Sequence, residues 1–123
     1  MNHSYDDQNI FAKILRGEIP NATVAETEHT LAFNDIMPQA PVHVLVIPKG
    51  PYVTFDHFMA EASDDAIVDF WKTVARIAAE KGIDATGYRI ISNAGRDGLQ
   101  EVPHFHLHLV GGHATGRMLE KRM

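Results

Sequence analysis

The chain has 123 residues, a formal net charge of −5 at pH 7 and no cysteine. This length suits one domain with a single core, and the lack of cysteine excludes disulfides and thiolate zinc ligands. The 11 basic residues are too scattered for a surface that follows nucleic-acid phosphates. The polar, acidic N-terminus is unlike a secretory signal, and no apolar run reaches the roughly 18 residues of a membrane span. We therefore expect a cytoplasmic protein without a nucleic-acid or membrane partner.

The first half of the chain predicts one short helix followed by three strands. Residues 9–16 carry apolar side chains at helical spacing, with Asn9 or Asp7 as a candidate N-cap. Strands are expected at 23–26, 30–35 and 42–48, the last of them largely buried because it is β-branched and mostly apolar. The links between these strands are short, so the three strands can form an antiparallel meander.

The second half predicts a long helix and two more strands. Ser63 is a good N-cap, and the helix continues to Lys81 and Gly82. Its apolar stripe consists of Ile67, Phe70, Trp71, Val74, Ile77 and Ala78. Strands are expected at 88–92 and 104–110, with a glycine-containing loop at 93–100. The prediction is a single α+β domain over residues 1–123, with an antiparallel five-stranded sheet, one short N-terminal helix and one long helix. Residues 1–7 and 113–123 are expected to be flexible or to contact a partner.

Three histidines alternate along the last predicted strand: His104, His106 and His108. Successive side chains of a strand point to opposite faces, so the three imidazoles share one face, roughly 6.5 Å apart along the strand. Three interpretations are open: an exposed face that tolerates histidine, a metal site with neutral imidazole ligands, or a catalytic cluster. In the last, one histidine attacks or moves protons while its neighbours orient it or bind an anion.

The loop that precedes these histidines favours the catalytic interpretation. Gly95, Gly98 and Gln100 lie just before the strand, and turns of this kind can direct several backbone N–H groups at an oxyanion. A metal site would more usually add a carboxylate, and only Glu101 is at hand. The combination of loop and histidines therefore indicates a phosphate-containing ligand.

The sequence resembles the histidine triad family, whose signature is His-φ-His-φ-His-φ-φ with φ apolar. Residues 104–110, HFHLHLV, match it in full. The segments NIFAKILRGEIP, LAFNDIMPQAPVHVLVIPK and SNAGRDGLQEVPH resemble other parts of the family, so the similarity runs from about residue 8 to 112. The pattern is most similar to the branch of purine nucleoside phosphoramidases.

The resemblance implies a role for each matching residue. His106 would be the nucleophile on the α-phosphorus, with His104 and His108 orienting it, binding phosphate oxygens and passing protons. His43 matches a fourth active-site histidine, and Asp35 would bind the ribose hydroxyls. The base would lie in an apolar slot formed by Ile10, Phe11, Ile14, Phe33 and Ile36. Sugar and phosphate would contact Asn93, Leu99, Gln100 and Glu101, with His106 and His108 on the phosphate.

Without the resemblance, several of these residues have simpler explanations. Ile10, Ile14 and Phe33 would be ordinary core residues, Asp35 a turn residue, and His43 a buried histidine with satisfied hydrogen bonds.

The implied reaction cleaves the bond to the α-phosphorus of nucleoside 5′-phosphoramidates or acyl-adenylates. It passes through a nucleotidyl-histidine and releases a purine nucleoside monophosphate, with no cofactor, in a homodimer. The alternatives are a dinucleoside polyphosphate hydrolase, a nucleotide-binding scaffold without turnover, and a metal-dependent protein that uses the three histidines.

Some positions depart from the family pattern. Zinc-containing relatives have ligands where this chain has Asn9, Ala12 and Pro51, and only His104 of that set remains, so we predict no metal. Leu99 replaces a common glycine, which restricts the backbone. Glu101 replaces a frequent serine, and His113 stands where arginine is common.

Overall fold

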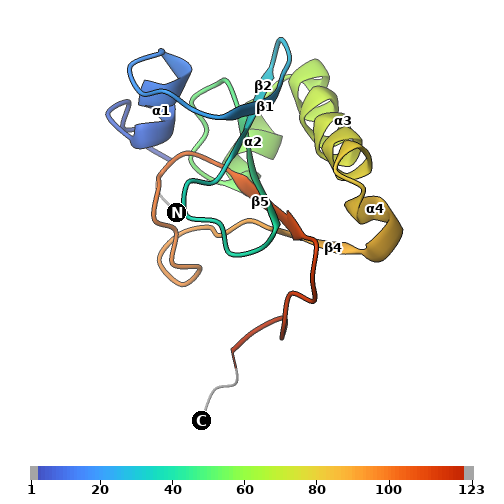
Figure 1. Ribbon diagram of the computed structural model, residues 1–123. Coiled ribbons are helices and arrows are strands. Elements are labelled where there is room, and N and C mark those ends of the chain that lie inside the picture. The colour runs from blue at the N-terminus through green and yellow to red at the C-terminus, as the bar shows by residue number, and fades with distance from the viewer. Residues whose placement is uncertain (1–2, 121–123) are drawn as a thin grey trace.

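The computed structural model describes residues 3–120, which form a five-stranded antiparallel sheet with helices on both sides (Figure 1). The strands are β1 (Thr23–Glu26), β2 (Thr30–Asn34), β3 (Val42–Pro48), β4 (Tyr88–Ile91) and β5 (Leu107–Gly111), in the spatial order β1-β2-β3-β5-β4. The helices are α1 (Ile10–Leu15), α2 (Phe55–Glu61), α3 (Asp64–Glu80) and α4 (Ile83–Thr86). The predicted α+β fold, the meander and the two predicted helices are confirmed.

The two predicted helices begin at side-chain caps. The Asn9 side chain accepts a hydrogen bond from the Ala12 amide at the start of α1, and Ser63 accepts one from the Ala66 amide at the start of α3. The apolar stripe of α3 faces the sheet, with Ile67 and Trp71 at its half-buried margin. Local capping and helical periodicity therefore agree with the tertiary packing.

Two short helices, α2 and α4, were not predicted. In α2 only Phe58 is buried, so the segment shows no apolar stripe that would mark a helix. The helix begins at Thr54, whose hydroxyl accepts a hydrogen bond from the His57 amide. Phe58 stacks on Phe105 with ring centroids 5.2 Å apart, so α2 is held by one large core contact.

The two faces of the sheet have separate cores, and β3 contributes to both. Val44 and Val46 face α2 and α3, where they pack with the buried aromatic residues of that side. Leu45 and Ile47 face α1 and pack with Phe11, Ile14, Leu31 and Phe33. Figure 1 shows α1 and α3 on opposite sides of the sheet. The histidines described below open toward the α1 side.

The last strand is shorter at its beginning than predicted. It starts at Leu107, so His104 and His106 precede it and only His108 pairs in the sheet, with Leu45 and Ile91. The preceding backbone groups bond elsewhere: the Phe105 amide donates to the Tyr52 carbonyl, and the His106 carbonyl accepts from the Ser92 hydroxyl. The predicted alternation nevertheless holds, because Phe105, Leu107 and Leu109 all enter the α3-side core.

The expectation that residues 1–7 and 113–123 are flexible or contact a partner stays a prediction. Residues 3–7 contact the chain itself, as described below, whereas residues 1–2 and 121–123 lie outside the described part. The C-terminal segment runs away from the sheet (Figure 1) after its backbone carbonyls at residues 115–117 accept hydrogen bonds from the Arg89 guanidinium. Within residues 3–120 no helix is long and apolar enough to cross a membrane. The cytoplasmic location stays a prediction.

Candidate active site

A cavity of about 430 Å³ opens on the α1 side of the sheet, between α1, the end of β2 and the loop 92–101. We call it the large cavity. Of the residues expected to bind substrate, it is lined by Ile10, Phe11, Ile14, Phe33, Asp35, Ile36, Asn93, Leu99, Glu101, His106 and His108. The fold therefore brings together residues that lie almost a hundred positions apart in the sequence.

Sequence reasoning missed other apolar lining residues, including Ile19, Met37, Leu45 and Val102. Leu45 could have been found, because it shares a face of β3 with His43 under the alternation of a strand. The other three lie in loops, where no periodicity indicates which side chains face a cavity.

Gln100 is the expected binding residue that does not line the large cavity. Its side-chain oxygen accepts from the Gly95 amide at 3.0 Å, and its side-chain nitrogen donates to the Val53 carbonyl at 2.7 Å. It therefore fixes the loop 93–100 against the segment that precedes α2. In the same loop Leu99 has a φ of 56°, a left-handed conformation that favours glycine.

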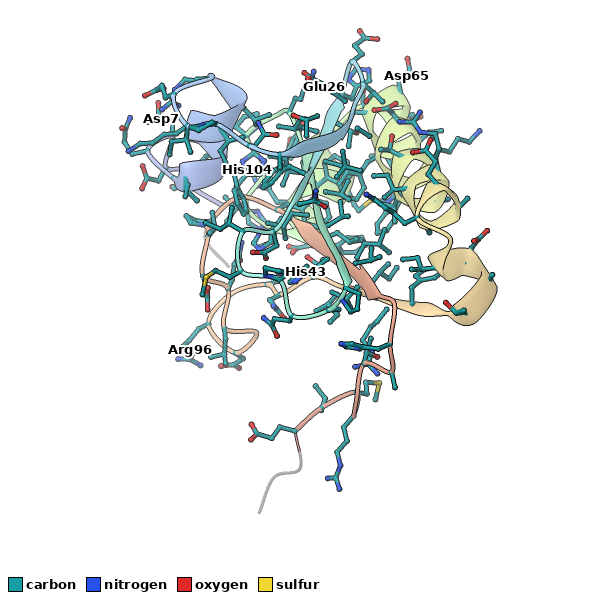
Figure 2. The ribbon with its side chains drawn as sticks, in the orientation of Figure 1. Asp7, Glu26, His43, Asp65, Arg96 and His104 are labelled. Carbon is teal, nitrogen blue, oxygen red and sulfur yellow. The ribbon has the colours of Figure 1, made fainter. Side chains whose placement is uncertain are left out.

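A second, smaller cavity of about 250 Å³ lies on the other side of His108. It is lined by His43, Arg89 and His113, and it shares Asn93 and His108 with the large cavity. Figure 2 shows that His43 and His104 lie within the body of the molecule, whereas Arg96 projects outward from its loop; only 5% of His43 and none of His104 is exposed.

The tautomer of His106 follows from its backbone contact. Its Nδ1 lies 2.7 Å from the His104 carbonyl oxygen, which can only accept, so Nδ1 carries the hydrogen and Nε2 is the unprotonated nitrogen. In residues 3–120 every fully buried side-chain nitrogen or oxygen has a hydrogen-bond partner. Because no partner exists there for this Nε2, it must be open to the large cavity. A free imidazole lone pair in a cavity is what a nucleophile requires.

His108, His43 and Asp35 form a hydrogen-bond relay. The Gln39 amide donates to His43 Nδ1 at 3.0 Å, so His43 Nε2 carries the hydrogen. That Nε2 lies 2.9 Å from His108 Nδ1 and 3.4 Å from an Asp35 carboxylate oxygen. His108 Nδ1 therefore accepts, and its Nε2–H is left to donate to a bound group. Asp35 also accepts from the Met37 amide, so it serves the predicted turn as well.

His104 is hydrogen bonded at both ring nitrogens. Nε2–H donates to the Pro48 carbonyl at 2.9 Å, and Nδ1 accepts from the Tyr5 hydroxyl at 2.6 Å. The ring thus lies beside the large cavity without lining it, and no nitrogen is left for a metal.

Burial keeps the triad neutral. Desolvation lowers the pKa of His104 to about 4, and burial together with the neighbouring His106 and His43 lowers the pKa of His108 to about 4. Burial also lowers the pKa of His106, against the opposing effect of the Asp35 and Glu101 carboxylates. Near pH 7 all three imidazoles are therefore uncharged, and His106 keeps its lone pair.

Asp35, His43 and His108 could in principle hold a cation, since one ligand atom of each lies within 4.8 Å of the others. A metal-bound imidazole normally donates a hydrogen bond from its second nitrogen. The second nitrogen of His43 instead accepts one from the Gln39 amide. Metal binding through Nε2 would then require a fully deprotonated imidazole, so these residues fit a hydrogen-bond relay better than a metal site.

The family model described as HIT domain matches residues 16–115. The chain is 52% identical over 121 residues to an uncharacterized 13.2 kDa HIT-like protein of Azospirillum brasilense, covering 98% of this chain and 99% of the relative. It is 43% identical over 113 residues to the purine nucleoside phosphoramidase of Escherichia coli K12, covering 92% and 94%.

The fold also resembles a solved histidine triad protein from Clostridium difficile, with a TM-score of 0.83 and 40% identity, covering 94% of this chain and all of that one. The family model spans most of the chain, and both relatives align over nearly its whole length. The chain therefore belongs to the HIT family.

Proposed function

We propose that this protein is a nucleotide hydrolase that cleaves the bond to the α-phosphorus of purine nucleoside 5′-phosphoramidates or acyl-adenylates. The observation that carries the proposal is the unprotonated Nε2 of His106, fixed by the His104 carbonyl and open to a cavity with an apolar slot. The similarity to a purine nucleoside phosphoramidase supports the same reaction class.

In the first step His106 Nε2 attacks the α-phosphorus. A bond forms between Nε2 and phosphorus, and the bond from phosphorus to the leaving nitrogen breaks. That nitrogen departs as an amine after it takes a proton from water in the open cavity. The His104 carbonyl accepts from Nδ1–H and stabilises the positive charge that develops on the His106 ring. In the second step water attacks phosphorus and gives one proton back to the solvent. The bond between phosphorus and Nε2 breaks, which releases the nucleoside monophosphate and restores His106.

His108 stabilises the reacting phosphate with a hydrogen bond. Its Nε2–H donates to a phosphoryl oxygen, where hydrogen bonds matter most as charge builds up. The His43 Nε2–H donates to His108 Nδ1 and so holds His108 as the neutral Nε2–H tautomer that makes this contact.

The charge of the large cavity favours a phosphoramidate over a dinucleoside polyphosphate. Its lining within residues 3–120 contains the carboxylates of Asp35 and Glu101 but no lysine or arginine. A polyphosphate leaving group carries several negative charges that this lining would repel. An amine leaving group carries none, so it meets no such penalty.

The remaining contacts follow the same assignment. The base lies among the apolar side chains that α1 and β2 contribute, and Asp35 accepts hydrogen bonds from the ribose hydroxyls. An apolar slot accepts any purine, so the base preference has to be measured by comparing the turnover of substrates that carry different bases.

The proposal is tested by turnover of adenosine 5′-phosphoramidate and of diadenosine polyphosphate, with wild-type protein and with His106→Ala. We expect wild-type turnover of the phosphoramidate to exceed that of the polyphosphate, and His106→Ala to bind AMP without turnover. His29→Ala serves as a matched control, because His29 lines neither cavity. Full AMP binding by a wild-type protein that turns over neither substrate would instead identify a nucleotide-binding scaffold.

We further propose a homodimer that uses the free edge of β4. The edge strand β4 exposes Tyr88, Ile90 and Ile91, with 48%, 47% and 36% of these side chains accessible. Open edges with apolar side chains are templates for pairing with a second chain. Sedimentation velocity should give a dimer for the wild type and a shift toward monomer for Ile90→Lys. A wild-type monomer at all concentrations would reject this assembly.

A further inference from the structure

Tyr5 connects the N-terminal arm, residues 3–8, to the first histidine of the triad. Its hydroxyl lies 2.6 Å from His104 Nδ1, and the two rings meet edge-on with centroids 5.6 Å apart. Because His104 Nε2–H already donates to the Pro48 carbonyl, Nδ1 has no hydrogen and the Tyr5 O–H must be the donor. Burial raises the pKa of Tyr5, so the hydroxyl stays protonated.

The arm itself is fixed to α1 and its cap. The Asn9 side chain donates to the Asp6 carbonyl at 2.8 Å, and the Arg16 guanidinium donates to the Asp7 carbonyl at 2.7 Å. Both contacts lie within two residues of Tyr5. The tyrosine hydroxyl is therefore held in place by backbone contacts that do not involve the cavity.

From His104 the connection continues to the nucleophile. The His104 ring is fully buried and anchored on both sides, by Tyr5 at Nδ1 and by Pro48 at Nε2. The carbonyl of the same residue accepts the Nδ1–H of His106 at 2.7 Å. A shift of His104 would thus move the acceptor that fixes the tautomer and direction of the His106 ring. Tyr5 lines neither cavity, and its direct contact with the triad is with His104.

We propose that Tyr5 is a positioning residue for the nucleophile His106: its hydroxyl anchors the His104 ring, and the His104 carbonyl then keeps His106 Nε2 unprotonated and directed at phosphorus. By occupying Nδ1, Tyr5 also keeps a proton off His104 while positive charge develops on His106. The inference rests on the proposed function, because it assigns Tyr5 a part in that reaction.

The test uses Tyr5→Phe, which keeps the ring and deletes the hydroxyl. Tyr52→Phe is the matched control, since Tyr52 is also half-buried and its hydroxyl has no hydrogen-bond partner within residues 3–120. With adenosine 5′-phosphoramidate, we expect kcat of Tyr5→Phe to fall about tenfold while KM is unchanged, the factor that one lost hydrogen bond supplies. The control should match wild type. Rates are expressed per AMP-binding site, so that unfolded protein does not imitate a lower kcat.

A second readout does not depend on turnover. Nitrogen-15 NMR of the histidine rings should show His104 Nδ1 moving toward the resonance of an unbonded, unprotonated nitrogen in Tyr5→Phe, and not in Tyr52→Phe. Unchanged kcat, a rise in KM that accounts for the loss, or an unmoved His104 resonance would each overturn the inference. If the wild type itself shows no turnover, the proposed function fails, a result separate from any difference between the two variants.

Discussion

Lowering the pH should destabilise this protein well before its carboxylates are protonated. His104 and His108 have pKa values of about 4 in the folded chain, against an ordinary value of 6.5 that applies when the chain is unfolded. Between pH 6.5 and about 4 the unfolded chain therefore binds more protons at these two histidines than the folded chain does. The stability from keeping these rings neutral is complete above pH 6.5 and is lost as the pH falls toward 4.

The size of the effect follows from linkage. Between its folded and unfolded pKa values, each histidine contributes about 1.4 kcal/mol per pH unit to the slope of the unfolding free energy. The pair together contributes about 3 kcal/mol per pH unit. Burial of His106 adds to the slope with the same sign. A domain of this size is stable by about 5–15 kcal/mol, so a loss over one to two pH units is a large fraction of the total.

Urea unfolding followed by fluorescence of Trp71, the single tryptophan, measures this dependence. The range should run from about pH 7.5 to about pH 5, because the lowered pKa values of Asp56 and Asp69 act in the same direction only near and below 3.8. His108→Gln should reduce the slope by about 1.4 kcal/mol per pH unit. An unfolding free energy that stays constant from pH 6.5 to 5 would refute the reasoning that these rings resist protonation.

Three substitutions test other parts of the structure. His43→Ala leaves the Gln39 amide and His108 Nδ1 without partners. We expect the free energy of unfolding in urea to fall by about 2–4 kcal/mol and kcat to fall at least about tenfold. An unchanged kcat would exclude the relay. Phe58→Ala removes a fully buried ring and should lower the free energy of unfolding by about 3–5 kcal/mol, with KM unaltered in the folded enzyme. A decrease below about 1 kcal/mol would contradict the packing assigned to α2. Leu99→Gly removes the strain of a left-handed leucine, which stabilises the folded chain by about 1–2 kcal/mol. The extra conformational entropy of glycine stabilises the unfolded chain by up to about 1 kcal/mol. Calorimetry should therefore show equal or higher stability, and a marked decrease would mean that Leu99 packs more firmly than its 79% exposure indicates.

Much of the fold could be predicted because local signals and tertiary packing agree. Ser63 and Asn9 cap their helices as their residue types suggest, and the alternation in β3 divides its side chains between two cores. Helix α2 could not be predicted, because a helix with one buried residue leaves no periodic pattern. The early end of β5 could not be predicted either, since the backbone around His104 and His106 bonds to Tyr52 and Ser92 rather than to a strand.

The site shows the same division. Alternation and family resemblance identified the histidines and the apolar slot, because those residues occur in contiguous motifs. The sequence could not show that Tyr5 reaches His104 across 99 positions, or that Gln100 turns away from the cavity to hold its loop. His43 was ambiguous between a core histidine and a functional one, and its contacts satisfy both descriptions: it is buried, and it bonds to His108. Long-range hydrogen bonds of this kind leave no local pattern.

The most direct test of the account is to trap the covalent intermediate. Wild-type protein mixed with adenosine 5′-phosphoramidate should be quenched within one turnover under mildly basic denaturing conditions, which preserve a phosphorus–nitrogen bond to histidine, and then mapped by peptide mass spectrometry. We predict one nucleoside monophosphate on His106 and none in His106→Ala. Turnover that proceeds with no such adduct, with the adduct on another histidine, or at the wild-type rate in His106→Ala, would contradict the central claim.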